Sequence, residues 1–238
     1  MKNTATIALK ELKSYLTSPM AYIVTCVFLL LTGTFFTTYL AGTQYTDTSI
    51  RGFVESGNIL VLLFAAVLTM RLIAEERKLG TWELLLTAPV RDTEVVLGKF
   101  LASLAVLVGM LALTLYYPFL LEGLGDPDWG PIRTSYLGLL LLGSVSLAIG
   151  IFASSLTSNQ IVAAVVAGGI LFALWFVGMA ASFAPEAVGE IISYLSLSYH
   201  FNDFIRGVVD TRAIIYYLSV TALFLYLAIR SLETSRWG

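Results

Sequence analysis

Six separate runs of apolar residues, most of them about 20 residues long, constrain this chain more than any other feature of its sequence. A helix of roughly 20 apolar residues spans the hydrocarbon core of a bilayer. The runs lack the strict alternation of apolar and polar residues that marks the strands of a membrane barrel. We therefore predict six transmembrane helices, over about residues 20–41, 57–73, 100–121, 135–156, 161–183 and 213–229.

The composition agrees with a membrane protein. Hydrophobic residues make up 58% of the chain and charged residues only 13%, whereas a soluble domain carries about twice that charged fraction. The apolar runs use most of the length, so we predict one all-α integral membrane domain over residues 1–238. The net charge of −2 provides no basic face for nucleic acid, which excludes that class of partner.

The basic residues predict the orientation, because cytoplasmic loops carry an excess of lysine and arginine. With the N-terminus inside, ten basic residues fall on the cytoplasmic side and four outside. The inner set is Lys2, Lys10, Lys13, Arg71, Arg77, Lys78, Arg91, Lys99, Arg230 and Arg236, and the outer set is Arg51, Arg133, Arg206 and Arg212. We therefore expect a multi-pass protein of the cytoplasmic (inner) membrane with both termini in the cytoplasm. Arg71 and Lys99 are the expected anchors at the membrane boundary.

Residues 4–18 have the pattern of an interfacial amphipathic helix. One helical face is apolar and the other is polar or basic: the first holds Ala5, Ala8, Leu9, Leu12 and Leu16, and the second Thr6, Lys10, Lys13 and Thr17. Such a helix lies in the membrane interface with its apolar face toward lipid. Pro19 ends it and lets the chain turn into the bilayer. The alternative is a plain extension of the first transmembrane helix.

Residues 185–212, between the fifth and sixth predicted helices, hold apolar stretches that are too short to span a membrane. We predict short re-entrant or interfacial helices on the extracytoplasmic side, and an ordinary extracellular loop is the alternative. His200, Asp203 and Arg206 are the polar residues of interest in this segment. His200 fits an interfacial polar residue better than a catalytic base.

Several patterns that carry chemistry are missing from the sequence. It contains no Walker-type phosphate loop, no His-Glu-x-x-His, no Gly-x-Ser-x-Gly and no zinc-binding cysteine set. We expect no catalytic, cofactor or metal site in this chain. Ion-coupled carriers need ionisable groups at membrane depth, and residues 134–185 contain none. Small residues four apart, such as Gly150 and Ser154, are expected to pack helices together.

Residues 75–97, between the second and third predicted helices, form the most informative segment. Gly80 ends the second helix, Thr81 caps a new one with Glu83 in its first turn, and Pro89 stops it. The leucines of that short helix are Leu84, Leu85 and Leu86. Exposed leucines need a partner, either the lipid surface or a groove on a cytoplasmic protein. From the spacing alone, an ordinary interfacial loop is equally good.

This segment resembles the signature of ABC-2 type exporter permeases. The similarity runs through Glu75-Glu-Arg-Lys-Leu-Gly80-Thr81-Trp-Glu83-Leu-Leu-Leu-Thr-Ala-Pro89 and closes with Leu97-Gly98-Lys99-Phe100. The later motifs resemble the gliding-motility type of these permeases: Asp128-Trp-Gly130, Ser135-Tyr-Leu-Gly138, residues 149–157, residues 159–163, His200-Phe, Arg206-Gly-Val and Asp210-Thr-Arg212. Membership of the subtype does not establish a role in gliding.

The resemblance implies a membrane subunit whose residues 75–97 contact a separate ATP-binding subunit. In that interpretation the leucines fill an apolar groove on the partner, while Glu75, Glu76, Arg77 and Glu83 set the register by charge. ATP and Mg would be held by the partner, and the working unit would contain a second permease copy or a homologous subunit. Some gliding-type systems add an auxiliary membrane protein with an extracytoplasmic domain. The alternative function is a membrane scaffold for an ATPase or motility complex without substrate passage.

Overall fold

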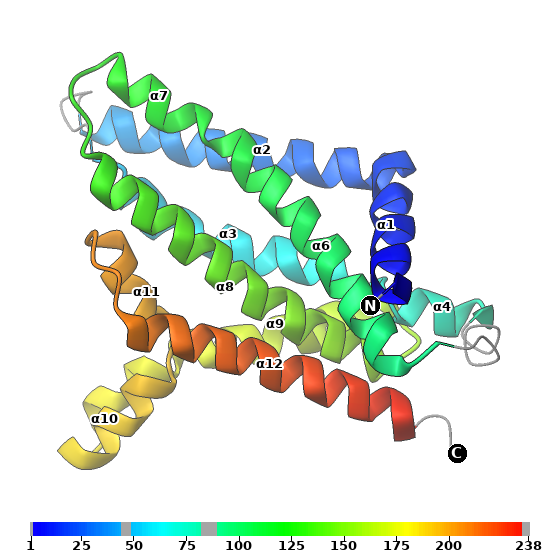
Figure 1. The fold of residues 1–238 in the computed structure, drawn as a ribbon. Helices are drawn as coiled ribbons and strands as arrows, with labels where there is room; N and C mark the ends of the chain where they lie inside the picture. Colours follow the sequence, from blue (N-terminus) through cyan, green and yellow to red (C-terminus); the bar gives the residue numbers. More distant parts are fainter. Residues whose placement is uncertain (1, 44–48, 82–89, 235–238) are drawn as a thin grey trace.

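A computed structural model describes residues 2–43, 49–81 and 90–234, and this part of the chain forms an all-helical bundle (Figure 1). The elements in order are α1 (Lys2–Thr17), α2 (Pro19–Gly42), α3 (Arg51–Thr69), α4 (Ala74–Lys78), α6 (Asp92–Thr114), α7 (Tyr116–Glu122), α8 (Trp129–Ser155), α9 (Gln160–Phe176), the 3₁₀ helix η1 (Val177–Phe183), α10 (Glu186–Leu195), α11 (Leu197–Ile205) and α12 (Thr211–Thr234). No strand occurs in these three ranges.

Within the described residues, six helices are long and apolar enough to cross a membrane, which confirms the predicted multi-pass all-α fold. Three spans are single helices: α2 (Pro19–Gly42), α8 (Trp129–Ser155) and α12 (Thr211–Thr234). The other three each join two elements: α3 and α4 (Arg51–Lys78), α6 and α7 (Asp92–Glu122), and α9 and η1 (Gln160–Phe183). The second and sixth helices extend beyond the apolar runs predicted for them. Arg230 ends the apolar run of α12 but not the helix, which continues to Thr234, because a long charged side chain reaches water from a helix end.

The central helix of the bundle is α8, which packs against α3, α6, α9, α11 and α12. Its middle turns are almost entirely buried, as at Leu142, Val145 and Ile149. Gly143 permits one of the closest contacts, since a Cβ at this position would overlap the side chain of Leu107 in α6. By contrast, α2 and α9 keep most of their apolar surface exposed, so they form the periphery of this chain.

The N-terminal helix α1 is separate from α2 and lies across one end of the bundle (Figure 1). The chain turns at Ser18, whose hydroxyl accepts a hydrogen bond from the Met20 N–H at 3.3 Å, and Pro19 begins the next helix. Leu9 and Leu16 are exposed on the face predicted to meet lipid. A separate N-terminal helix is therefore present, beginning at Lys2 instead of residue 4, and the alternative of a continuous first helix is wrong; its place in the membrane interface stays a prediction.

At the other end of the bundle, the chain between α9 and α12 is helical, as predicted, and not a plain loop. The fifth span tightens into η1, against which α10 packs, and α11 packs on α8. Figure 1 shows α10 extending away from the bundle while α11 stays beside it. We refer below to the two ends of the bundle as the α1 end and the α11 end.

Candidate functional site

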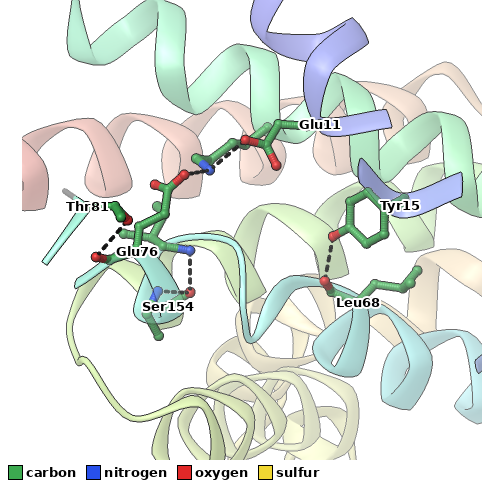
Figure 2. A network of polar contacts seen from close by, with 9 residues as sticks. Glu11, Tyr15, Leu68, Glu76, Thr81 and Ser154 are labelled. Carbon is green, nitrogen blue, oxygen red and sulfur yellow. Dashed lines mark hydrogen bonds and ion pairs between the residues drawn. The ribbon is translucent and has the colours of Figure 1, made fainter. Parts of the chain in front are cut away.

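The strongest candidate site is a set of polar contacts at the α1 end, where four helices meet around the segment that leaves α3 (Figure 2). Its members come from α1, α6, α8 and the α3–α4 region, and we call them the anchor cluster: Glu11, Tyr15, Arg71, Glu76, Lys99 and Ser154. Of these residues, Glu76 lies within residues 75–97, and Arg71 and Lys99 are the two predicted boundary anchors. The other members, Glu11, Tyr15 and Ser154, belong to α1 and α8, the helices that contact this region.

Lys99 of α6 is the centre of the anchor cluster. Only 2% of its side chain is exposed, and its Nζ donates to Glu11 Oε1 at 3.1 Å and to Glu76 Oε1 at 2.7 Å. Figure 2 shows the Glu11 and Glu76 carboxylates approaching this nitrogen from two sides. A buried ammonium group without a carboxylate would be strongly destabilising. One lysine therefore ties α1 and α4 to α6, a role that its prediction as a boundary anchor did not include.

Ser154 of α8 holds the break between α3 and α4. The helix α3 ends at Thr69, and the following turn leaves backbone groups without helical partners. Ser154 Oγ accepts from the N–H groups of Ile73 and Ala74, at 3.1 and 3.0 Å, and donates to the Met70 carbonyl at 3.0 Å. A side chain from another helix thus supplies the cap that α4 lacks locally.

The approach of α8 to this turn depends on a glycine one helical turn before Ser154. A Cβ at Gly150 would overlap the hydroxyl of Thr69, so only glycine allows this spacing between α3 and α8. The small-residue pattern at 150 and 154 was predicted only to pack helices together. The structure confirms the packing at Gly150, and it gives Ser154 a hydrogen-bonding role that the spacing could not reveal.

Tyr15 fastens α1 to the end of α3. Its hydroxyl donates to the Leu68 carbonyl at 2.7 Å, and the guanidinium carbon of Arg71 lies 4.7 Å from its ring centroid. Arg71 also donates to Ser18 Oγ at 3.4 Å, where α1 turns into α2. Burial raises the pKa of the Tyr15 phenol well above its usual range. The phenol therefore stays a neutral hydrogen-bond donor at physiological pH.

A tight contact between α1 and the first turns of α6 completes the arrangement. A Cβ on Gly98 would lie 2.7 Å from Ile7 and 3.1 Å from the Thr4 carbonyl oxygen, so α1 sits directly on α6 at this point. Glu94 accepts from the Arg91 N–H at 3.2 Å and from the Asn3 side chain at 3.1 Å. Arg91 occupies the N-cap position of α6, which begins at Asp92.

Some of the remaining residues of the predicted segment lie in the described part of the chain, and others lie outside it. Glu75 lines a cleft beside Lys99, Arg77 lies in a second cleft between α8 and α12, and Thr81 donates to the Glu76 carbonyl at 3.3 Å. Gly80 has a φ of +70°, which is the left-handed conformation that ends a helix at glycine. The predicted short helix, with Glu83, Leu84, Leu85, Leu86 and Pro89, lies outside the described residues.

His200, Asp203 and Arg206 lie in or directly after α11, at the α11 end. The His200 ring is buried and stacks on Tyr216 with centroids 4.2 Å apart, while its Nε2 lies 2.9 Å from the Tyr194 carbonyl oxygen. Burial lowers the pKa of this imidazole, so its neutral form is favoured. The neutral ring packs α11 against α10 and α12. The Arg206 carbonyl accepts a long hydrogen bond from Arg51, at 3.4 Å.

The chain was compared with models of protein families and with curated proteins. The model of a family described as ABC-2 family transporter protein matches residues 5–235, which is nearly the whole chain. No curated protein matches the chain.

Proposed function

The chain belongs to the ABC-2 family of transporter proteins, and from that membership we propose that it is the permease subunit of an ATP-driven exporter. A separate ABC-type ATP-binding subunit would bind ATP and Mg and would dock on residues 75–97. In this proposal the α1 end of the bundle and both termini face the cytoplasm, in the inner membrane. The basic residues counted along the sequence favour that orientation.

The family match carries the proposal, and the structural observation that supports coupling through residues 75–97 is the double ion pair of Lys99. A force delivered to the chain after α4 reaches the membrane through the chain itself, which continues into α6, and through the contacts between α4 and the spanning helices. Glu76 of α4 contacts Lys99 of α6 at 2.7 Å, and Ser154 of α8 holds the backbone at Ile73 and Ala74. The segment that would receive the ATPase is thus fastened to the helices that would move.

The docking surface in this proposal consists of Leu84, Leu85 and Leu86, with the charges of Glu75, Glu76, Arg77 and Glu83 setting its register. Truncating a buried interface leucine to alanine costs roughly 1–3 kcal/mol, or roughly tenfold to hundredfold in affinity. Rim charges contribute less and depend on salt. A Gly80→Pro change should misdirect the segment, because proline cannot adopt a positive φ.

The test is recovery of the co-expressed ATP-binding subunit with the full chain in detergent. The Leu84→Ala/Leu85→Ala variant should lower recovery at least roughly tenfold while membrane insertion is unchanged. Leu9→Ala is the control, because Leu9 is an exposed leucine of α1 at the same end of the bundle and does not line the cleft that holds Arg77. Equal recovery of the ATPase by wild type and the double variant would refute docking through these leucines.

The proposed working unit contains two permease halves, either two copies of this chain or this chain with a homologous subunit. The family resemblance of the later motifs also favours the gliding-motility type, with an auxiliary membrane protein in some systems. The mass of the intact complex tests the assembly, and one permease half without a second would contradict it. ATP hydrolysis stimulated by a substrate class would separate an exporter from a scaffold, for which no substrate changes the rate.

A further inference from the structure

The third span contains a break between α6 and α7, on the side of the bundle away from α1 (Figure 1). Here α6 ends at Thr114. The Leu115 N–H donates to the Ala112 carbonyl at 3.2 Å and not to the Leu111 carbonyl. Pro118 has no N–H for the carbonyl four residues before it, which is that of Thr114. The break therefore removes two α-helical hydrogen bonds from a membrane-spanning segment.

Side-chain hydroxyls supply the donors that the backbone lacks. Thr114 Oγ1 donates to the Leu111 carbonyl at 2.7 Å, and the hydroxyl of Tyr136 in α8 donates to the Thr114 carbonyl at 2.8 Å. A proline is tolerated within a membrane helix when a neighbouring side chain satisfies the freed carbonyl in this way. Because one donor comes from another helix, the angle between α6 and α7 depends on α8.

Beyond the break, Tyr117 fastens α7 to α2. Its ring stacks on Phe36 with centroids 4.7 Å apart, and its hydroxyl donates to the Leu29 carbonyl at 3.3 Å. The same hydroxyl lies 3.1 Å from Thr32 Oγ1. On this side of the break, the third span is thus held to α2.

On the α1 side of the break, α6 stands away from α2 across an apolar groove of about 690 Å³. Figure 1 shows the two helices diverging toward α1. Both walls carry small side chains, with Ala105 and Gly109 on α6 and Ala21 and Cys26 on α2. A Cβ built on Gly109 meets no atom within 4 Å. Small residues let two membrane helices approach closely, so α6 has both the space and the surface to tilt onto α2.

A smaller cavity of about 20 Å³ lies at the break itself. Its lining comes from four helices and includes Thr32 of α2, Gly57 of α3, Thr114 of α6 and Tyr136 of α8. Protein interiors are close-packed, and a void leaves the side chains around it room to shift. A change in the angle between α6 and α7 therefore meets free space at the point of bending.

We propose that residues 114–118 form a hinge about which α6 tilts onto α2 and closes the groove, while α7 stays fastened to α2. The Tyr136 hydroxyl holds the hinge at its present angle, and Pro118 prevents the helical bond that would stiffen it. Hinges are short segments of this kind at the ends of helices. In the proposed exporter, a push at residues 75–97 would tilt α6 from its other end, where Lys99 lies. The hinge itself rests only on contacts within this chain.

The test measures distances between spin labels by double electron–electron resonance, in the full chain in lipid nanodiscs that hold one chain each and no ATPase. Cys26→Ala removes the native thiol. One label pair, Ile23→Cys with Leu101→Cys, spans α2 and α6 on the α1 side of the break, and the other, Thr38→Cys with Leu120→Cys, spans α2 and α7. All four positions are exposed. We expect two distances for the first pair, from an open and a closed groove, and one distance for the second.

Three variants make the test specific. Tyr136→Phe removes the donor to the Thr114 carbonyl and should shift the first pair about fivefold toward the closed groove, the value of one hydrogen bond. Pro118→Ala supplies the missing N–H and should leave the first pair a single distance, because a continuous helix has no hinge. Tyr116→Phe is the matched control, since the Tyr116 side chain lies beside the same break but is 63% exposed. It should leave both pairs unchanged.

Three outcomes would overturn the proposal. A single distance for the first pair, unchanged in Tyr136→Phe, would mean that the break is a fixed kink. Two distances that persist in Pro118→Ala, or a second pair that changes together with the first, would place the bending elsewhere in the chain. Equal shifts in Tyr136→Phe and Tyr116→Phe would mean general loosening of the span without a specific hold by Tyr136. Because no ATPase is present, these results do not depend on the proposed partner.

Discussion

Replacing Lys99 with methionine should destabilise the protein strongly, because it removes the buried cation that two partly buried carboxylates share. Glu11 Oε1 and Glu76 Oε1 lie 3.1 and 2.7 Å from Lys99 Nζ, and their side chains are only 15% and 22% exposed. Without the lysine, two negative charges remain at most about 6 Å apart, because each oxygen lies within 3.1 Å of the Nζ position, and at an effective dielectric constant of ~20 they repel each other by about 3 kcal/mol. For a chain of this size, that loss lowers the melting temperature by roughly 6–12 °C.

The measurement is thermal unfolding of the full chain in lipid nanodiscs at neutral pH. Lys13→Met is the matched control, because Lys13 is exposed on α1 and does not line the cleft that holds Glu11 and Lys99, so it should change the melting temperature little. Adding Glu11→Gln and Glu76→Gln to Lys99→Met removes both negative charges and should recover most of the loss. Equal melting temperatures for Lys99→Met and wild type, or no recovery in the triple variant, would show that the ion pairs do not hold these helices together.

Three further predictions follow from the same end of the bundle. Ser154→Ala should cost about 1–3 kcal/mol and speed amide exchange in α4, measured by mass spectrometry, whereas the buried Ser146→Ala should spare α4, because its hydroxyl bonds only within α8. Tyr15→Phe should cost about 1 kcal/mol in chemical unfolding. The raised pKa of Tyr15 favours its neutral form in the folded state, so the wild type should lose stability as the pH rises above 10, its ordinary value, and the variant should lose less. Cysteine labels in intact cells should react at Asp128 and not at Ser14 if the α1 end is cytoplasmic, and the reverse pattern would invert the proposed topology.

The number of spanning helices could be predicted from the sequence because the membrane requirement is simple. A span must be apolar over its length and must satisfy its own backbone hydrogen bonds, and a run of apolar residues records both demands. The helix boundaries were less accurate. The break between Thr69 and Ala74 contains no proline or glycine that could have marked it in the sequence. It is stabilised instead by Ser154, which comes from a helix distant in the chain. A local pattern cannot contain a cap that another helix supplies.

The candidate site shows the same limit. Residues 75–81 and Lys99 were singled out by charge, by glycine and by resemblance, but Glu11 and Tyr15 were not. On a helical wheel they fall between the apolar and polar faces of α1, so an amphipathic pattern gives them no role. They matter because α6 packs beside the side of α1 that holds them, and this packing depends on the tertiary structure. Gly98 was the only available signal, and its meaning depends on Ile7 lying directly above it.

The contacts of Lys99 imply that α1 and α4 respond to the same displacement. In the proposed exporter, a shift of α4 either breaks the pair between Glu76 and Lys99 or moves the start of α6 with it. Breaking that pair leaves a buried lysine short of one carboxylate, so moving α6 costs less. Because Glu11 holds the same ammonium group and Ile7 rests on Gly98, α1 must follow α6. If α1 lies in the membrane interface, as predicted, it shifts across the lipid surface with α6, and in the proposed exporter a push at residues 75–97 would move the protein against its own leaflet.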